Sequence, residues 1–227
     1  MAGETAKTRG VCLAVRPWSR TSHIVSWLTP EGKITTSVKG AVRPKSSFLG
    51  QYDLNYECEI VYYLNSRGGI HALRECTPTA LREELRGDYR KLLLAEHFRA
   101  VADSLAPSGP EANDWFRLLS DSIDRLCRDG NLLAQMLIFE TAALRLTGLS
   151  PEIEAASGYF ALRGERRIPV SAEVAACIKN PGREKKFEIL LDASRVIGVF
   201  YMFHLDEVPR TRRFLLREIQ QKERENR

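Results

Sequence analysis

Three cations crowd one short stretch of the chain, residues 35–48, which reads TTSVKGAVRPKSSF. Lys39, Arg43 and Lys45 follow a strand-like run, and the glycine and proline among them predict a loop at the end of that strand. Folding gives no reason for three cations to gather in one loop. Ammonium and guanidinium groups neutralise phosphates, so this pattern indicates contact with a polyanion.

Further cations come from the same part of the chain. Residues 1–50 hold eight Lys and Arg against two Glu, a net charge of +6, whereas the whole chain carries +5. Several fall at strand ends or in loops, where side chains converge on a groove. Such a set gives a salt-dependent affinity for nucleic acid that is largely independent of base sequence. The predicted DNA-contacting cations are Arg16, Arg20, Lys33, Lys39, Arg43 and Lys45.

Aromatic residues are interleaved with these cations. Trp18 lies in a predicted turn beside Pro17, where a base-stacking role and a core position fit equally well, and it joins the predicted DNA contacts. Trp27, Phe48 and Tyr62 are predicted to be core, because aromatic residues in a small barrel are more often buried.

The first third of the chain has the pattern of a small β-barrel. Between residues 10 and 74, five short runs rich in β-branched and aromatic residues are separated by turn material such as TPEGK and NSRGG. Five strands in so short a segment fit an OB-fold, the five-stranded barrel that often holds oligonucleotides. An SH3-like barrel also fits.

Helical periodicity replaces this pattern near residue 77. Thr77 and Pro78 predict a helix start, and further helices are predicted at 111–129, at 132–148, in two closing segments after residue 192, and weakly at 171–178. The predicted fold is α+β, with an OB-fold domain at 1–76 and an all-α helical bundle at 77–227. Residues 209–227 carry seven Lys and Arg against three Glu, which either extend a DNA path or complement a helix terminus.

Composition and motifs argue against several other classes. The longest apolar run, 196–203, is far shorter than a membrane span, and no secretory signal is visible, so no membrane association and a cytoplasmic location are expected. The five cysteines are scattered and predict reduced thiols. No phosphate-binding loop, dinucleotide fingerprint, metalloprotease motif or nucleophile elbow occurs, and the four histidines lie on different predicted elements. Neither an enzyme nor a cofactor is expected.

The residues of the basic head resemble the N-terminal barrel of the RecO family of bacterial recombination mediators. The resemblance rests on an R-P-aromatic turn at 16–18, an S-x-I-V-x-x-L-T-x-x-G stretch at 22–32 and a K-G-A-x-R-P-K-S-x-F loop at 39–48. The helical half is similar to the family's F-E-x-x-x-L-x-x-x-G-x-x-P helix and exit at 139–151. Its closing segment, HLDEVPRTRRFLL, has Thr211 where the family usually has Ser.

Two departures from the family pattern are visible. Many RecO proteins carry a four-cysteine zinc site just after the helix that ends at Gly148, whereas residues 149–178 contain only Cys177. One cysteine cannot supply the four ligands of a structural zinc, so no metal is expected. Val42 stands where relatives often have a basic residue, which removes one possible phosphate contact.

The resemblance implies a non-catalytic protein that binds single- and double-stranded DNA and anneals complementary strands. It also implies binding to the C-terminal tail of single-stranded-DNA-binding protein and action with RecR in loading RecA during recombinational repair. Two other hypotheses stay open. The basic barrel of an adaptor could dock an acidic protein surface, or the barrel could bind RNA.

Overall fold

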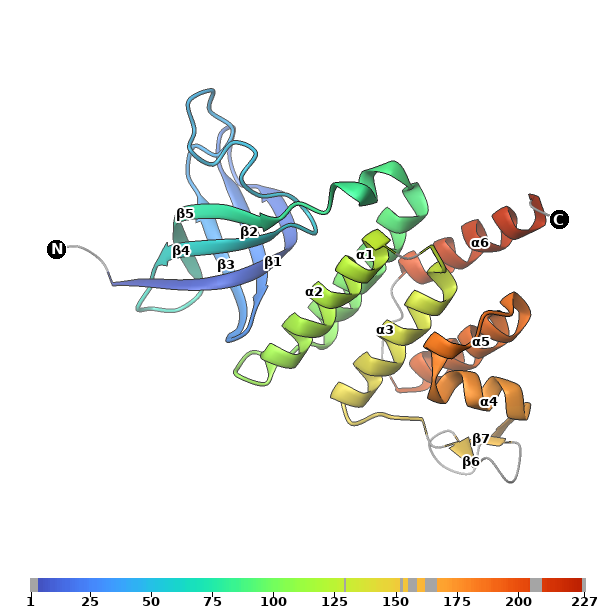
Figure 1. The fold of residues 1–227 in the computed structure, drawn as a ribbon. Helices are drawn as coiled ribbons and strands as arrows, with labels where there is room; N and C mark the ends of the chain where they lie inside the picture. Colours follow the sequence, from blue (N-terminus) through green and yellow to red (C-terminus); the bar gives the residue numbers. More distant parts are fainter. Residues whose placement is uncertain are drawn as a thin grey trace. The chain divides into compact units, whose positions relative to one another are not determined.

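A computed structural model describes residues 4–128, 130–151, 153–154, 159–161, 167–204 and 210–225 (Figure 1). The chain forms two compact units. The first, here called the barrel unit, comprises residues 1–83 and 102–123. The second, the helical unit, comprises residues 84–101 and 124–227.

Five strands of the barrel unit close into a barrel in the order β1-β2-β3-β5-β4. Their bounds are β1 Thr5–Pro17, β2 His23–Thr29, β3 Gly32–Val38, β4 Glu57–Tyr63 and β5 Ile70–Ala80. The long strand β1 pairs with both β2 and β4, and β3 and β5 pair in parallel. This topology is that of an OB-fold, which confirms the predicted fold class and sets aside the SH3-like alternative.

The barrel core is built from the inward side chains of these strands. Trp27 is fully buried, and its indole Nε1–H donates to Thr36 Oγ1 at 2.9 Å, so the polar atom of the ring is satisfied inside the core. Tyr62 is also buried, and Phe48 packs half-buried against the same cluster. The prediction that these three aromatic residues are core is confirmed.

The predicted helix start at Thr77 is wrong. Residues 77–80 belong to β5, where Thr77 pairs with Glu59 and Pro78 pairs with Cys58 beside a register shift of β4. A proline lacks a backbone donor and is tolerated in a strand at such an irregularity. Burial of Cys76 in the barrel core keeps the chain extended here, and tertiary packing overrides the local helix signal. The division into residues 1–76 and 77–227 stays a prediction, and β5 extends past its boundary.

After β5 the chain makes a short 3-10 helix, η1 Glu83–Gly87, and then α1 Tyr89–Leu105 and α2 Ala112–Arg128. The parts of α1 and α2 within residues 102–123 belong to the barrel unit. A buried network fixes α2 to the barrel there, because Arg82 donates to Ser120 Oγ at 2.6 Å and to Glu57 Oε2 at 3.4 Å. Ser120 Oγ also donates to Glu57.

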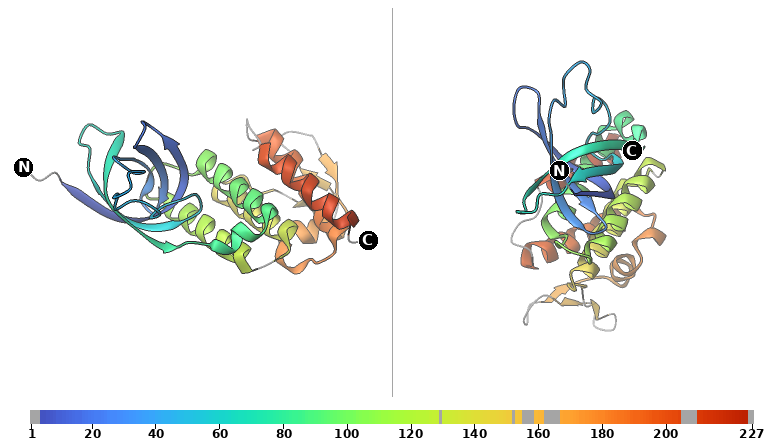
Figure 2. Two further views of the ribbon diagram at one scale, coloured as in Figure 1. Left: turned by 90° about the horizontal axis from the view of Figure 1, so that it is seen from above. Right: turned by 90° about the vertical axis from the view of Figure 1, so that its left-hand side faces the viewer.

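The helical unit contains α3 Leu132–Leu146, α4 Ala172–Lys179, α5 Phe187–His204 and α6 Arg210–Glu225, with a 3-10 turn, η2 Pro181–Arg183 (Figure 2). Helix α3 is buried along most of its length, as its apolar sequence predicts, and it contacts α5 and α6. Asn131 caps it, accepting from Ala134 N–H at 3.1 Å. The short helix predicted at 171–178 is confirmed as α4, with Ser171 as its cap.

A small antiparallel sheet precedes α4. It consists of β6 Ile153–Glu154, β7 Tyr159–Ala161 and β8 Arg167–Pro169. No strand was predicted in this segment, where scattered Gly and Pro indicate irregular structure. Strands of two or three residues are too short to show period-2 alternation, so no pattern could reveal them.

One ion cluster holds the four main helices of the helical unit together. Glu140 of α3 is fully buried and accepts from Arg212 Nε at 2.7 Å and Arg212 Nη2 at 3.0 Å. His97 Nε2 of α1 lies 2.8 Å from the same carboxylate. Tyr201 of α5 donates to the Glu140 backbone carbonyl at 3.2 Å, and Arg212 also donates to the Ser194 carbonyl at 2.6 Å.

Candidate nucleic-acid interface

The ends of three strands meet at one end of the barrel. Pro17 at the end of β1 pairs with His23 at the start of β2, and His23 pairs with Val38 at the end of β3. The residues that follow or precede these positions therefore lie close together in space. Arg16 and Lys39 come from separate strands but reach the same end of the barrel.

Hydrogen bonds fix the two loops at this end to each other. The Val42 amide donates to the Thr21 carbonyl at 3.4 Å, and the Gly40 amide lies 3.4 Å from Ser22 Oγ. Gly40 has a φ of +68°, a left-handed conformation that glycine adopts without steric cost. In Figure 2 the β1–β2 turn and the connection after β3 project from the same end of the barrel.

The two loops border a surface groove of about 790 Å³. Ile24 of β2, Ser37 of β3 and Ile70 of β5 also line it. Trp18 stands at its edge with 70% of its surface exposed, so the structure places this ring on the surface and not in the core. The full lining is Trp18, Ser19, Thr21, Ser22, Ile24, Ser37, Lys39, Gly40, Arg43 and Ile70, a set with two cations and no acid.

The side chains of Lys39 and Arg43 are exposed and have no hydrogen-bond or ion-pair partner among the residues that the structure describes. The Arg43 side chain lies over Gly40, where a Cβ would be 3.2 Å from Arg43 Cδ. A cation without a protein partner keeps its full capacity to bind an anion, because no carboxylate competes for it.

The other predicted cations divide into two groups. Arg16 and Arg20 are exposed at the same end of the barrel, and Lys45 is exposed in the same connection as Arg43. These three lie outside the groove lining. They extend the positive surface around the groove, so five of the six predicted cations share one end of the barrel.

Lys33 is the exception. It lies near the start of β3, six residues before Lys39, which at about 3.3 Å per residue separates the two by roughly 20 Å. Its ammonium group donates to the Asp103 backbone carbonyl at 2.7 Å and lies 4.0 Å from Asp103 Oδ1. The structure therefore gives Lys33 a partner within the chain and does not bring it to the groove.

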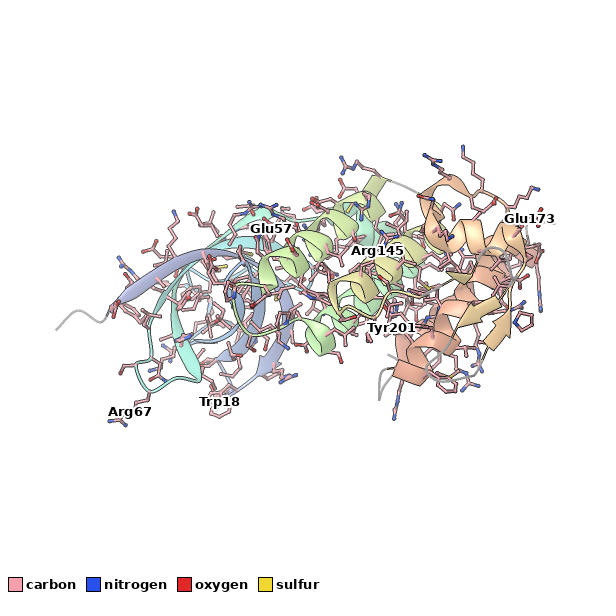
Figure 3. All side chains as sticks on the ribbon, turned by 90° about the horizontal axis from the view of Figure 1, so that it is seen from below. Trp18, Glu57, Arg67, Arg145, Glu173 and Tyr201 are labelled. Carbon is pink, nitrogen blue, oxygen red and sulfur yellow. The ribbon has the colours of Figure 1, made fainter. Side chains whose placement is uncertain are left out.

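Sequence reasoning missed two residues at or just before the start of β5. Ile70 enters the groove lining because β5 pairs in parallel with β3, with Ile70 opposite Thr35, and no local pattern predicts a parallel pairing. Arg67 is exposed in the β4–β5 connection and, like Trp18, points away from the barrel (Figure 3). Its signal was present in the turn NSRGG, since OB-folds use the β1–β2 and β4–β5 loops to hold oligonucleotides.

His23 and Tyr52 form a side-chain contact in the barrel unit. His23 Nδ1 lies 2.8 Å from Tyr52 Oη, and this contact ties the start of β2 to the connection that follows β3. Burial, with smaller contributions from Cys12 and Cys76, raises the pKa of Tyr52 to about 12. The phenol is therefore protonated at neutral pH and adds no negative charge near the cations.

No group of three or more His, Cys, Asp or Glu in the described part of the chain could hold a metal ion. Part of the segment 149–178, on which the prediction of no zinc site falls, lies outside the described residues, and that prediction stays open. None of the helices that the structure describes is both long and apolar enough to cross a membrane.

Taken together, these features define an OB-fold protein with a basic groove at one end of its barrel. Family models give the more specific assignment. The model for Recombination protein O N terminal matches residues 1–82, and the model for Recombination protein O C terminal matches residues 86–213. The chain belongs to the RecO family of DNA repair proteins.

Several relatives carry the name DNA repair protein RecO. The protein from Moorella thermoacetica is 25% identical over 78% of this chain and 68% of its own length. The protein from Rhodopirellula baltica is 30% identical over 71% of this chain and 61% of its own length. That from Geobacter metallireducens is 29% identical over 64% of this chain and 59% of its own length. The matches thus span about three fifths to two thirds of these relatives.

Proposed function

We propose that this protein is a non-catalytic recombination mediator that binds single- and double-stranded DNA through the basic end of its barrel. It anneals complementary strands and, with RecR, helps to load RecA in recombinational repair. The RecO family membership supports the repair role. The groove that contains Trp18, Lys39 and Arg43 is the observation that supports DNA binding.

The chemistry of the groove suits a nucleic-acid strand better than a small anion. Lys39 and Arg43 offer ammonium and guanidinium donors for backbone phosphates, and Trp18 offers an exposed ring for a base. Arg16, Arg20 and Lys45 supply further positive charge around it. No side chain with a fixed hydrogen-bond pattern dominates the lining, so we expect binding with little base preference.

Lys33 is the member of the predicted set with the least support, because it already donates to Asp103. Arg67, in contrast, is a further candidate contact. The proposed DNA contacts are therefore Trp18, Arg16, Arg20, Lys39, Arg43 and Lys45, with Arg67 added.

The test is binding of a fluorescent single-stranded oligonucleotide, followed by anisotropy over a series of salt concentrations. In the barrel variant, K39Q/R43Q/K45Q, three cations are replaced by neutral side chains of similar length. We expect affinity to fall about tenfold or more at low salt. The slope of log K against log salt should become shallower by about two, since each single-strand phosphate contact contributes about 0.7.

A charge-matched control separates a local site from the effect of net charge. The control variant, R117Q/R128Q/R183Q, removes three exposed cations from α2 and η2. Its slope should remain that of the wild type. An unchanged slope in the barrel variant would remove this loop from the DNA site. Equal slopes in both variants would reduce the effect to net charge.

A second binding function is favoured by a pocket in the helical unit. A cavity of about 480 Å³ has Leu132, Phe187, Leu190 and Ile219 in its lining. Three cations stand around these apolar residues, namely Arg90, Lys185 and Lys222. We propose that this pocket holds the acidic, aromatic-ended C-terminal tail of single-stranded-DNA-binding protein.

The polar lining of this pocket also contains acids. Asp88 pairs with Arg90, with Nε and Oδ1 3.1 Å apart, which leaves Lys185 and Lys222 to meet the acidic tail. A synthetic tail peptide should bind with micromolar affinity, and K185Q/K222Q should weaken that binding. The barrel variant should bind the peptide as the wild type does. If the barrel variant alone lost the peptide, the adaptor hypothesis, in which the barrel docks an acidic partner, would replace this one.

A further inference from the structure

Helix α6 presents a face to solvent that carries four arginines and a phenylalanine. The arginines follow one another at intervals of three, four and seven residues along the helix. This spacing places them on one side of an α-helix, and all four are exposed. The opposite side holds the buried residues Arg212, Leu215 and Ile219. We call the exposed set the α6 outer face: Arg210, Arg213, Phe214, Arg217 and Arg224.

Helix stability does not explain the first two of these arginines. The first turn of α6 contains no acid, and Arg210 and Arg213 both occupy it. Cations at a helix N-terminus face the positive end of the macrodipole, which is unfavourable, and a sequence selected for folding alone would have Asp or Glu there. None of the four guanidinium groups has an ion-pair partner within the described ranges of the chain.

Phe214 lies in the middle of this charged face. It is 58% exposed and is four residues from Arg210 and three from Arg217, so it shares their side of the helix. A large exposed ring among cations offers a flat apolar surface on which a base can stack. The combination of guanidinium groups and an exposed aromatic ring is that of surfaces that hold nucleic-acid strands by phosphate contact and base stacking.

The spacing of the charges favours an extended polyanion. Arg213 and Arg224 are eleven residues apart, which corresponds to about 16 Å along the helix axis. A linear row of arginines of this length can meet several consecutive phosphates, each by a bidentate contact. An acidic peptide helix would need apolar partners at i, i+3 or i+4 and i+7, and the α6 outer face offers only Phe214.

We propose that the α6 outer face is a second nucleic-acid site, separate from the barrel groove, and that one chain holds two strands at once. The inference rests on the proposed DNA-binding function and adds to it the second strand that annealing requires. The barrel groove holds one strand, and the α6 outer face holds the other. Both sites act mainly through phosphates, so neither restricts the base sequence of the pair.

The test is the stoichiometry of binding for a single-stranded oligonucleotide too short to occupy both sites. The protein is titrated at low salt, well above the dissociation constant, and the number of strands per chain is counted. The α6 variant is R213Q/R217Q/R224Q, which leaves the buried Arg212 in place. It is compared with the barrel variant and with the control variant, R117Q/R128Q/R183Q.

We expect two strands per chain for the wild type and the control variant, and one for the α6 variant and for the barrel variant. The α6 variant should also anneal complementary strands at least about tenfold more slowly than the control variant, because the row of phosphate contacts is lost. Because the substituted residues are exposed, the urea unfolding midpoint of the α6 variant should equal that of the wild type. A shifted midpoint together with two strands per chain would contradict the proposal.

The remaining outcomes separate this inference from the barrel proposal. One strand per chain in both wild type and α6 variant would overturn the second site and leave the barrel site intact. If only the α6 variant lost binding, the barrel proposal would fail and the α6 site would stand alone. A third outcome combines two results: the wild type binds one DNA strand per chain, and it binds a polyglutamate peptide that the α6 variant does not bind. This outcome would make the face a protein-docking surface and overturn the proposal.

Discussion

Arg212 in the helical unit and Arg43 at the barrel rim have the same side chain in opposite surroundings. Arg212 is 6% exposed and donates to Glu140 and to the Ser194 carbonyl. Arg43 is exposed, and its guanidinium group has no partner within the part of the chain that the structure describes. The first has its charge neutralised inside the fold, whereas the second is available to an external anion. The role of an arginine is therefore read from its partners and not from its place in a basic segment.

The same contrast exists inside the barrel unit. Arg82 is buried and donates to the Asn55 carbonyl at 2.7 Å, to Ser120 and to Glu57. It lies in the unit that also carries the exposed cations of the groove. A count of charges cannot tell these roles apart. Arg212 shows this for the basic tail. It is buried, although Arg210 and Arg213, close to it in sequence, are exposed.

The largest effect should come from removing the acid that neutralises Arg212. Glu140→Gln leaves a buried guanidinium without its counter-charge, which typically costs about 3–5 kcal/mol. We expect the urea unfolding midpoint of the helical unit to fall markedly. Oligonucleotide affinity of the barrel groove should stay within about twofold, since the groove lies in the other unit.

Glu188→Gln provides the matched control, because Glu188 is an exposed acid on α5. Its free energy of unfolding should change by less than about 0.5 kcal/mol. A loss of affinity at the barrel groove in folded Glu140→Gln protein, with the control normal, would break the comparison by linking the buried cluster to the barrel site.

Acid should weaken the helical unit through the same carboxylate. Burial alone would raise the pKa of Glu140, but Arg212 and His97 hold it at about 2, below the ordinary value of 4.5. A lowered pKa gives stability that is complete above pH 4.5 and is lost as pH falls toward 2, because only the unfolded state takes up the proton in that range. The difference corresponds to about 3 kcal/mol.

The measurement is the unfolding midpoint of the helical unit from neutral pH down to pH 2. Glu140→Gln should be less stable at neutral pH and show a flatter dependence below pH 4.5 than the wild type. Parallel curves for the two proteins would mean that Glu140 takes up its proton at the same pH in the folded and unfolded states.

The barrel was predictable because its strands carry local signals. Alternating β-branched residues, the TPEGK turn and the loop from Lys39 to Phe48 gave five strands and the position of the basic connection. Several of the predicted cations lie near strand ends or in loops, so the sequence indicated that their side chains converge on a groove. Trp27 could be placed in the core from the crowding of aromatic residues in a small barrel.

What escaped prediction depends on contacts between distant segments. The extension of β5 to Ala80 is set by pairing with β4, and Ile70 reaches the groove through parallel pairing with β3. Lys33 was grouped with the loop cations because its partner, Asp103, is 70 residues away. The Glu140–Arg212 pair joins residues 72 apart, so the sequence offered two charged residues and no reason to connect them.

Trp18 tests the comparison at its finest level, because it is exposed whereas Trp27, Phe48 and Tyr62 of the same barrel contribute to the core. Trp18→Ala should weaken single-strand binding by about 1–3 kcal/mol through lost base stacking, without the change in salt slope that a lost phosphate contact produces. With 70% of the ring exposed, the unfolding midpoint should hardly move. Anisotropy titrations across the salt series measure both quantities.

Lys33→Gln is the companion variant for Trp18→Ala, since it removes a cation that already has a partner in the chain. Its affinity and salt slope should match those of the wild type, which would place the DNA site at one end of the barrel. A slope reduced by about 0.7 would show instead that a strand reaches the start of β3. In that case the strand would follow the length of β3, and the groove at the rim would be only the beginning of its path.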